Sequence, residues 1–335
     1  MRSKFFFSLD SIKAQYSSDG GSITCVTSKE APGFVNISFV SLKLKSKGFL
    51  EPIWHPNAHK IGHCLQGRAL VSIRNPAGVD TFTVEKGDVF FIQQGYIHTI
   101  QNISTDEIII NFALNHTDPE IMRFANAIYS LSDNVFGATF NSASSEFLSG
   151  LKKTKNQDMI GILPSMKPSS ESIPSEFKFN VDNSSKPVQT KGGFLQLAVK
   201  ANLPALDGLG ILRFGLNVKG NVEPHWHTNA GELVYIVKGK TRITVLDPAG
   251  NVEVLEVNGG QGAFAPASHF HNIENIGAEE VEVIAYFTHA SPDYIGIGEV
   301  AGSYSNELLA ATFNVASNYF DAFKKPEKPL IIVPI

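Results

Sequence analysis

The sequence feature that most constrains this chain is an internal repeat. Three pairs of segments match closely: residues 54–58 with 226–230, 75–78 with 247–250, and 138–141 with 311–314. The first two pairs are offset by 172 residues and the third by 173, so the two copies stay in register across most of the chain. A repeat of this length indicates a duplicated domain.

Each copy carries short apolar segments of the kind that form β-strands. They are rich in Val, Ile and Phe and are separated by Gly, Pro, Asn and Asp, a pattern typical of a β-sandwich or barrel. The expected strands include residues 69–73, 88–92, 234–237, 241–245 and 281–287. Helical segments are expected around 119–153 and 306–325, the second capped by Ser305 or Asn306.

The chain length supports two domains, each large enough to bury its own core. We predict an N-terminal barrel with helices over residues 1–162 and a C-terminal barrel with helices over residues 188–335. The segment between them, residues 163–187, is rich in Pro, Ser and Lys and is expected to be a linker or an exposed crossover.

Composition narrows the function classes. Apolar residues make up 43% of the chain and charged residues 18%, which is typical of a globular protein. A net charge of −4 and the lack of a long basic run argue against a nucleic-acid partner. The apolar run at residues 5–7 is too short for a signal peptide, and no run approaches the roughly 20 residues that span a bilayer. We expect no membrane partner and a cytoplasmic location, which the presence of only two cysteines, Cys25 and Cys64, also fits.

One segment of the second copy carries ligand-type residues at regular spacing. His225 and His227 are two residues apart, so on a strand they point to the same side. Glu232 follows after a turn at residues 229–231, and His271 is expected to point inward from a neighbouring strand. Three imidazoles and one carboxylate can then share one metal ion.

The His-Xaa-His plus Glu pattern, followed by Gly260, Pro266, His271 and Asn275, resembles the two sequence motifs of the cupin superfamily. The duplication and the terminal helices resemble bicupins of the oxalate decarboxylase type over nearly the whole chain. This resemblance implies an all-β fold of two cupin barrels, which are double-stranded β-helices or jelly rolls, each followed by short α-helices. It places the family's metal ligands on His225, His227, Glu232 and His271 and favours manganese. The donor set alone suits Mn²⁺ or Fe²⁺, and Zn²⁺ or Ni²⁺ less well.

The first copy has lost part of this pattern. Ile53 stands where the second copy has His225, and Lys60 stands where it has Glu232. His55, His59 and His98 leave an irregular metal site conceivable, but the positive charge of Lys60 opposes a cation. Two other interpretations are a purely structural barrel and a site in which Lys60 binds an organic anion.

The resemblance also raises a conflict about chemistry. Oxalate decarboxylases of this type use an arginine beside the metal and a lid glutamate, but Val222 and Leu50 stand at the arginine positions of the two copies, and residues 115–120 offer no clear lid match. Two other residues are candidate catalytic groups. His269 lies two residues before His271 and therefore on the same face if the strand is regular. Its expected roles are a base or a substrate contact, and the alternative is a side chain that faces solvent. Asp293 is a candidate acid on a lid segment.

Three functional hypotheses follow. The first is a metal-dependent enzyme, a lyase or oxidoreductase, acting on a small carboxylate, with oxalate decarboxylase or oxidase chemistry as the leading example. The second is a cupin that binds a sugar-like or other small metabolite through its metal without turnover. The third is a storage-like bicupin of the seed globulin type, which predicts decayed motifs in both copies. We take the enzyme as the working hypothesis and expect a homo-oligomer that buries the terminal helices.

Overall fold

The computed structural model describes residues 3–141, 150–151, 158–165, 171–323, 326 and 328–335. Its contacts divide the chain into two compact units. The C-terminal unit comprises Met1–Ser11, Ser28–Ile37 and Val181–Ile335, and the N-terminal unit comprises Ile12–Thr27 and Ser38–Asn180. The start of the chain joins the C-terminal unit, where Phe6–Ser8 pairs with Gln261–Ala263.

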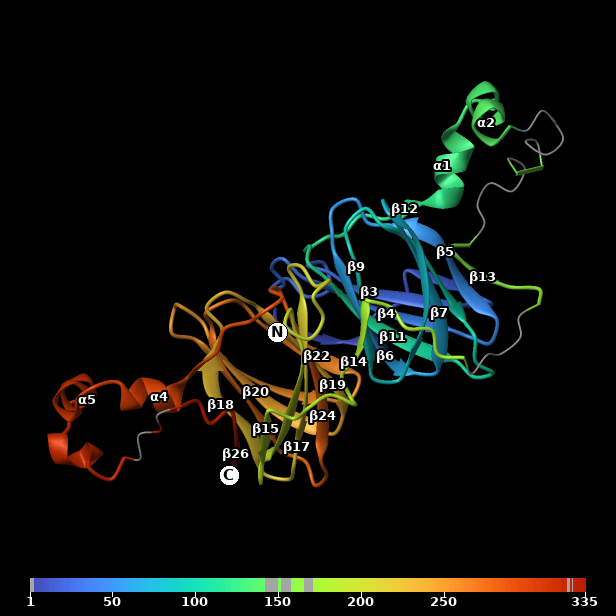
Figure 1. Cartoon of the computed structure of the whole chain (residues 1–335). Helices are drawn as coiled ribbons and strands as arrows, with labels where there is room; N and C mark the ends of the chain where they lie inside the picture. Colours follow the sequence, from blue (N-terminus) through green and yellow to red (C-terminus); the bar gives the residue numbers. More distant parts are fainter. Residues whose placement is uncertain (1–2, 142–149, 152–157, 166–170, 324–325, 327) are drawn as a thin grey trace. The chain divides into compact units, whose positions relative to one another are not determined.

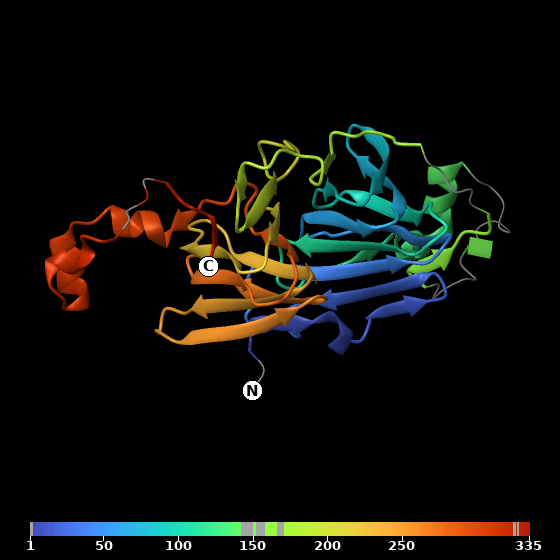
Figure 2. The same cartoon turned by 90° about the horizontal axis from the view of Figure 1, so that it is seen from below.

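The C-terminal unit is a barrel of two antiparallel sheets (Figures 1 and 2). One sheet has the order β1-β22-β19-β24-β17-β16-β15. The other has the order β21-β20-β23-β18-β25, and β26 also pairs with β18. The strands are β1 (Phe6–Ser8), β15 (Val188–Thr190), β16 (Gly193–Ala198), β17 (Gly210–Leu216), β18 (Gly220–Trp226), β19 (Glu232–Lys238), β20 (Lys240–Leu246), β21 (Val252–Asn258), β22 (Gln261–Ala265), β23 (Phe270–Asn275), β24 (Val281–Phe287), β25 (Ile295–Gly296) and β26 (Ile332–Pro334).

The N-terminal unit repeats this plan. Its sheets have the orders β14-β9-β6-β11-β4-β3-β2 and β12-β5-β10-β7-β8, with β13 also pairing with β5. The strands are β2 (Tyr16–Ser18), β3 (Gly21–Val26), β4 (Ser38–Leu44), β5 (Gly48–Trp54), β6 (Lys60–Gln66), β7 (Arg68–Asn75), β8 (Gly78–Glu85), β9 (Asp88–Ile92), β10 (Ile97–Asn102), β11 (Ile108–Leu114), β12 (Met122–Arg123), β13 (Ile160–Ile162) and β14 (Lys178–Asn180). The predicted all-β architecture of two duplicated barrels with a few short helices is confirmed.

Part of the segment predicted as a linker packs against the N-terminal barrel. β14 pairs with β9, and the Ile173 amide donates to Thr83 Oγ1 at 2.9 Å. β14 is the edge strand of its sheet and joins it through backbone hydrogen bonds with β9. Such pairing requires no strong apolar pattern in the sequence of the strand.

The repeated turn segments form hairpins that fix the strand register. Asn75 Oδ1 accepts hydrogen bonds from the amides of Ala77 and Gly78 at 2.8 and 3.0 Å, which closes the turn between β7 and β8. Asp247 Oδ1 accepts from the Ala249 amide at 2.9 Å between β20 and β21. Such side-chain turns explain why Asn and Asp occupy these positions.

Short helices follow each barrel and project away from it (Figure 1). They are α1 (Phe124–Ser130), α2 (Asp133–Phe140), α4 (Ile297–Gly302) and α5 (Asn306–Phe313), and there are 3₁₀ turns η1 (Leu9–Ser11) and η2 (Ser317–Phe320). Ser305 caps α5 as predicted, because its Oγ accepts from the Leu308 amide at 3.2 Å. Residues 142–149, 152–153 and 324–325 of the predicted helical segments lie outside the described residues.

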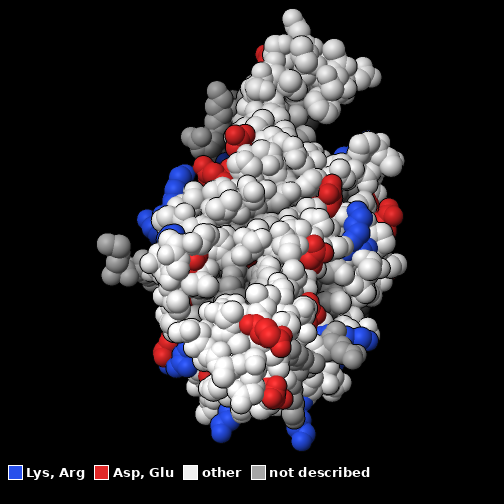
Figure 3. All heavy atoms as spheres, turned by 90° about the vertical axis from the view of Figure 1, so that its left-hand side faces the viewer, with Lys and Arg blue, Asp and Glu red and all other residues white. Residues whose placement is uncertain are grey.

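The surface shows no single dominant charge on the face in Figure 3, where acidic and basic side chains are interspersed in small groups. Within the part of the chain that the structure describes, no helix has the length and apolar character needed to cross a bilayer.

Candidate metal centre

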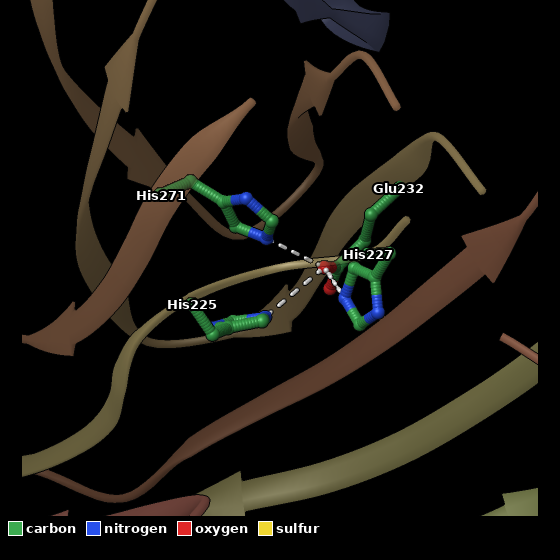
Figure 4. Close-up of side chains that lie close together, drawn as sticks. All are labelled: His225, His227, Glu232 and His271. Carbon is green, nitrogen blue, oxygen red and sulfur yellow. Dashed lines mark hydrogen bonds and ion pairs between the residues drawn. The ribbon is translucent and has the colours of Figure 1, made fainter. Parts of the chain in front are cut away.

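The four predicted ligands come together inside the C-terminal barrel. His225 lies on β18, opposite His271 on β23, and the β18–β23 pairing is irregular between Val222 and His225. His227 follows the end of β18, and Glu232 begins β19. Figure 4 shows the three imidazoles directed at one carboxylate. One ligand atom from each residue lies within 4.8 Å of the others.

The ligand atoms meet in a dry environment. Glu232 Oε2 lies 2.8 Å from His271 Nε2, 3.0 Å from His227 Nε2 and 3.7 Å from His225 Nε2. All four side chains are at most 3% exposed. Polar groups buried this deeply are costly unless each finds a partner.

The other ring nitrogen of each histidine fixes its orientation. His225 Nδ1 donates to the Glu223 carbonyl at 2.7 Å, His227 Nδ1 to the Asp293 carbonyl at 2.5 Å, and His271 Nδ1 to the His269 carbonyl at 2.8 Å. A neutral imidazole that donates from Nδ1 has a lone pair on Nε2. The three Nε2 atoms are therefore directed at the same point as the Glu232 carboxylate, an arrangement typical of metal ligands held by outer hydrogen bonds.

The electrostatics of this cluster favour a bound cation. Burial, together with a smaller contribution from the neighbouring His271, lowers the pKa of His225 from 6.5 to about 4, so this imidazole stays neutral near pH 7. Burial alone would raise the pKa of Glu232, but the three imidazoles around it hold the pKa well below its usual range. A divalent metal between the four groups would give the ionised carboxylate and the three Nε2 atoms one shared positive partner. The donor set fits such an ion.

The loop between His227 and Glu232 is built to return the carboxylate to the histidines. Asn229 Oδ1 accepts from the Asp293 amide at 2.9 Å, and the Gly231 amide donates to Thr288 Oγ1 at 2.8 Å. A Cβ on Gly231 would lie 2.7 Å from Phe264 Cζ, closer than real Cβ contacts. Glycine is therefore required where this loop passes the ring.

A cavity of about 260 Å³ opens beside His225, His227 and Glu232. Tyr294 is part of its wall and stacks on the His225 ring with centroids 4.5 Å apart and an angle of 18° between the planes. Burial and the nearby Glu223 and Glu232 carboxylates raise the pKa of Tyr294 well above its usual value, so its hydroxyl remains a neutral donor. Tyr294 was missed at the sequence level, although it follows Asp293 directly.

The structure places the two predicted catalytic side chains outside this cavity wall. Residues before β23 form a turn in which Ser268 adopts a φ of 61° and the His269 amide donates to the Pro266 carbonyl at 3.0 Å, so His269 precedes the regular strand. Its ring lies near Phe5, with centroids 6.4 Å apart. The exposed Asp293 carboxylate accepts from Thr228 Oγ1 at 2.7 Å, and it is the Asp293 carbonyl that contacts a ligand.

The equivalent position in the N-terminal barrel is occupied by a lysine. Lys60 Nζ lies 3.4 Å from His98 Nε2 and 4.1 Å from the centre of the Phe112 ring, and the residue is 5% exposed. His55 Nδ1 donates to the Glu120 carbonyl at 2.8 Å. His59 takes no part in this group, because its Nδ1 accepts from the Gln94 amide at 3.0 Å and its ring stacks on Phe91.

The interior around this lysine is a hydrophobic core. The cluster includes Ile53 and Leu50, the counterparts of His225 and Val222. Among the described residues, the one group of at least three potential metal ligands is the C-terminal cluster.

Comparison with known proteins gives two matches to a family model. The model described as cupin matches residues 7–147 and 179–320. Oxalate decarboxylase from Bacillus subtilis is 24% identical over 327 residues, which cover 93% of this chain and 83% of that protein. Germin-like protein 1 from Brassica napus is 31% identical over 116 residues, which cover 33% of this chain and 56% of that protein.

Solved structures support the same fold. A structure of Bacillus subtilis oxalate decarboxylase studied for its Mn(II) centres superposes with a TM-score of 0.88 at 21% identity, and the match covers 100% of this chain and 90% of that chain. At this identity the likeness concerns the fold.

Proposed function

This chain belongs to the cupin family, and we propose that its C-terminal barrel is a metal-dependent enzyme site acting on a small carboxylate. The metal would be Mn²⁺, with Fe²⁺ as the alternative, held by His225, His227, Glu232 and His271. The leading reaction class is that of its relative oxalate decarboxylase, either decarboxylation of oxalate or its oxidation by dioxygen.

The observation that carries the proposal is the orientation of the ligand atoms. Three Nε2 atoms and one carboxylate oxygen are directed at a common point, and three backbone carbonyls hold the rings in that orientation. Mixed imidazole and carboxylate donors suit Mn²⁺ and Fe²⁺. Support for Mn²⁺ comes from the similar structure with Mn(II) centres.

The residues around the centre would bind and orient the substrate. A bound divalent ion would supply Lewis acidity and open coordination positions, since four protein ligands leave two positions of an octahedron. The apolar walls exclude water, which strengthens electrostatic interactions within the site. The neutral Tyr294 hydroxyl is positioned to donate a hydrogen bond to an oxygen of the bound acid.

A second candidate is metal-dependent ligand binding without turnover. The observation that favours it is the position of Val222, which lines the cavity where oxalate decarboxylases of this type are expected to hold an arginine. Neither His269 nor Asp293 is part of the cavity wall to replace the missing proton donor.

The first experiment is elemental analysis of the untagged protein after loading with Mn²⁺. We expect close to one ion per chain, lost in His227→Ala. The matched control is His55→Ala, because His55 occupies the same position in the first copy and should leave the metal content unchanged. Absence of bound metal after reconstitution, or equal loss in both variants, would refute the proposed centre.

Turnover is tested on the loaded protein from acid to neutral pH. Decarboxylation converts oxalate and a proton to formate and carbon dioxide, whereas oxidation by dioxygen gives two carbon dioxide molecules and hydrogen peroxide. If neither product forms, and ligands still stabilise the protein in a chelator-sensitive way, the binding function replaces the enzyme.

The terminal helices support the expectation of a homo-oligomer. Large side chains on and near α5 are exposed, including Leu308, Phe313 and Tyr319. Burying them against a second copy would remove apolar surface from water. Light scattering coupled to gel filtration should give a mass above that of one chain, and a monomer would contradict the expectation.

A further inference from the structure

The cavity beside the candidate metal centre has almost entirely apolar walls. Apart from the three metal ligands that border it, two of its lining residues carry polar side-chain groups, Ser291 and Tyr294. The remaining wall residues are Leu195, Leu197, Val199, Leu212, Phe214, Val222, Phe287, Pro292, Ile331 and Ile332. The wall therefore offers no lysine, arginine or amide side chain to a second anionic group.

This chemistry is unfavourable for a small dianion. Oxalate that chelates a metal through one oxygen of each carboxylate leaves two further oxygens directed away from the ion. Against these walls such oxygens would lose water without gaining charged partners, which is costly for a polar group. The cavity is also larger than oxalate needs, since about 260 Å³ would hold roughly nine waters at about 30 Å³ each.

One wall residue is held in an unfavourable backbone conformation. Ile331 has a φ of 58°, in the left-handed region that β-branched residues rarely adopt. Its amide donates to Glu223 Oε1 at 2.8 Å, and its carbonyl accepts from the Glu223 amide at 2.8 Å. A glycine or asparagine would suit this conformation better, so an isoleucine here indicates that its apolar side chain has a use in the cavity.

Tyr294 supplies a polar group to the cavity wall beside the metal ligands. The Tyr294 hydroxyl is buried and meets no partner with full hydrogen-bond geometry, although the Glu223 carboxylate lies nearby and the ring stacks on His225. A ligand oxygen near the centre can accept from this hydroxyl. The rest of the ligand meets aliphatic and aromatic side chains.

We propose that the ligand of this centre is a 2-oxo or 2-hydroxy monocarboxylate with an apolar side chain, which chelates the metal through its carboxylate and adjacent oxygen and places its side chain against Ile331 and the other apolar walls. This inference rests on the proposed metal-dependent function on a small carboxylate and replaces oxalate, its leading example, with another class of substrate. It predicts that apolar length, rather than a second charge, determines affinity.

The test is a binding series on the Mn²⁺-loaded full chain. Dissociation constants are measured by calorimetry for oxalate, 2-oxopropanoate, 2-oxobutanoate and 2-oxopentanoate, and Mn²⁺ electron paramagnetic resonance reports ligand entry to the ion. Each added methylene should tighten binding up to about fourfold, which corresponds to ~0.8 kcal/mol. Oxalate should bind at least tenfold more weakly than 2-oxopentanoate, and chelator should abolish binding of the series.

Two variants remove the apolar side chain of Ile331, namely Ile331→Asn and Ile331→Gly. Both asparagine and glycine readily adopt the left-handed backbone conformation of this position. Both should retain Mn²⁺ and keep their folded state, while the gain per methylene falls towards none. Ile335→Gly, at an exposed position, is the control and should keep the wild-type series.

The outcomes separate the two proposals. Absence of Mn²⁺ uptake would refute the proposed function and this inference with it. Normal Mn²⁺ uptake with oxalate as the tightest ligand, with no dependence on chain length, or with an unchanged series in both Ile331 variants would refute the inference alone.

Discussion

Replacing Lys60 by methionine should stabilise the N-terminal unit, because the native side chain places an amine in a dry core. Lys60 is 5% exposed, and among the residues that the structure describes no carboxylate forms an ion pair with it. Burial lowers the pKa of Lys60 from 10.5 to about 7. At ~1.36 kcal/mol per pKa unit, this costs up to about 4 kcal/mol of unfolding free energy at pH 7.

The pH dependence of this effect has a defined sign. The unfolded chain keeps the Lys60 proton up to about pH 10.5, whereas the folded chain releases it near pH 7. Between these values the unfolded state binds more protons, so the stability of the native protein rises with pH by up to ~1.4 kcal/mol per pH unit. The advantage of Lys60→Met should therefore shrink from about 4 kcal/mol at pH 7 to about 1 kcal/mol at pH 10.

The two tryptophans allow the assay to report on one unit. Trp54 lies in the N-terminal unit and Trp226 in the C-terminal unit, so a Trp226→Phe background leaves Trp54 as the reporter. Urea unfolding is followed by its fluorescence at several pH values from 7 to 10. Lys86→Met, at an exposed turn, is the control and should change little. A stability difference for Lys60→Met that does not vary with pH would refute the reasoning.

Three further predictions concern the metal centre. The double substitution Ile53→His with Lys60→Glu restores the missing ligand types of the first copy, so elemental analysis should find two Mn²⁺ per chain, and finding one would contradict the equivalence of the copies. Gly231→Ala places a Cβ 2.7 Å from Phe264 Cζ and should shift the ligand loop, lowering metal affinity roughly tenfold or more in chelator competition; an unchanged affinity would show that the loop tolerates the methyl group. The pKa of His225 is about 4 in the folded chain, compared with the usual histidine value of 6.5, so between these pH values the unfolded state binds more protons. The metal-free protein should therefore lose stability as the pH falls from 6.5 to 4. Thermal unfolding with chelator tests this, and His225→Gln should show a shallower dependence.

The strands that the sequence predicts best are those whose apolar pattern is strong and whose ends are marked by turn residues. The predicted bounds 88–92 and 281–287 coincide with β9 and β24. β1 and β14 are three residues long and were not predicted. They are defined by hydrogen bonds to β22 and β9, and this tertiary context leaves no periodic signal in so short a segment.

The ligand cluster could be predicted because each ligand residue has a defined sequence position relative to an expected strand or turn. The surroundings of the cluster were not. His269 was placed by assuming regular alternation, but the left-handed Ser268 shows that the strand begins after it. Asp293 was chosen for its carboxylate, whereas its carbonyl orients His227 and the adjacent Tyr294 enters the cavity wall. Which chemical group of a loop residue faces a site depends on backbone geometry that spacing alone does not give.

The two copies meet one electrostatic requirement in different ways. In each barrel an imidazole Nε2 faces the interior, from His98 in the first copy and from His271 in the second, and a buried lone pair needs a positive or donating partner. In the first copy Lys60 provides that partner 3.4 Å from His98 Nε2, as part of the chain itself. In the second copy Glu232 stands at the same position, 2.8 Å from His271 Nε2, and brings a negative charge that increases the need for a cation. The exchange of lysine for glutamate thus changes a barrel that carries its own amine donor into one suited to bind a metal ion. On this view Ile53 can replace a third histidine in the first copy because no ion has to be coordinated there. The double substitution in the first copy tests this argument directly, since Ile53→His alone should add no metal while Lys60 remains.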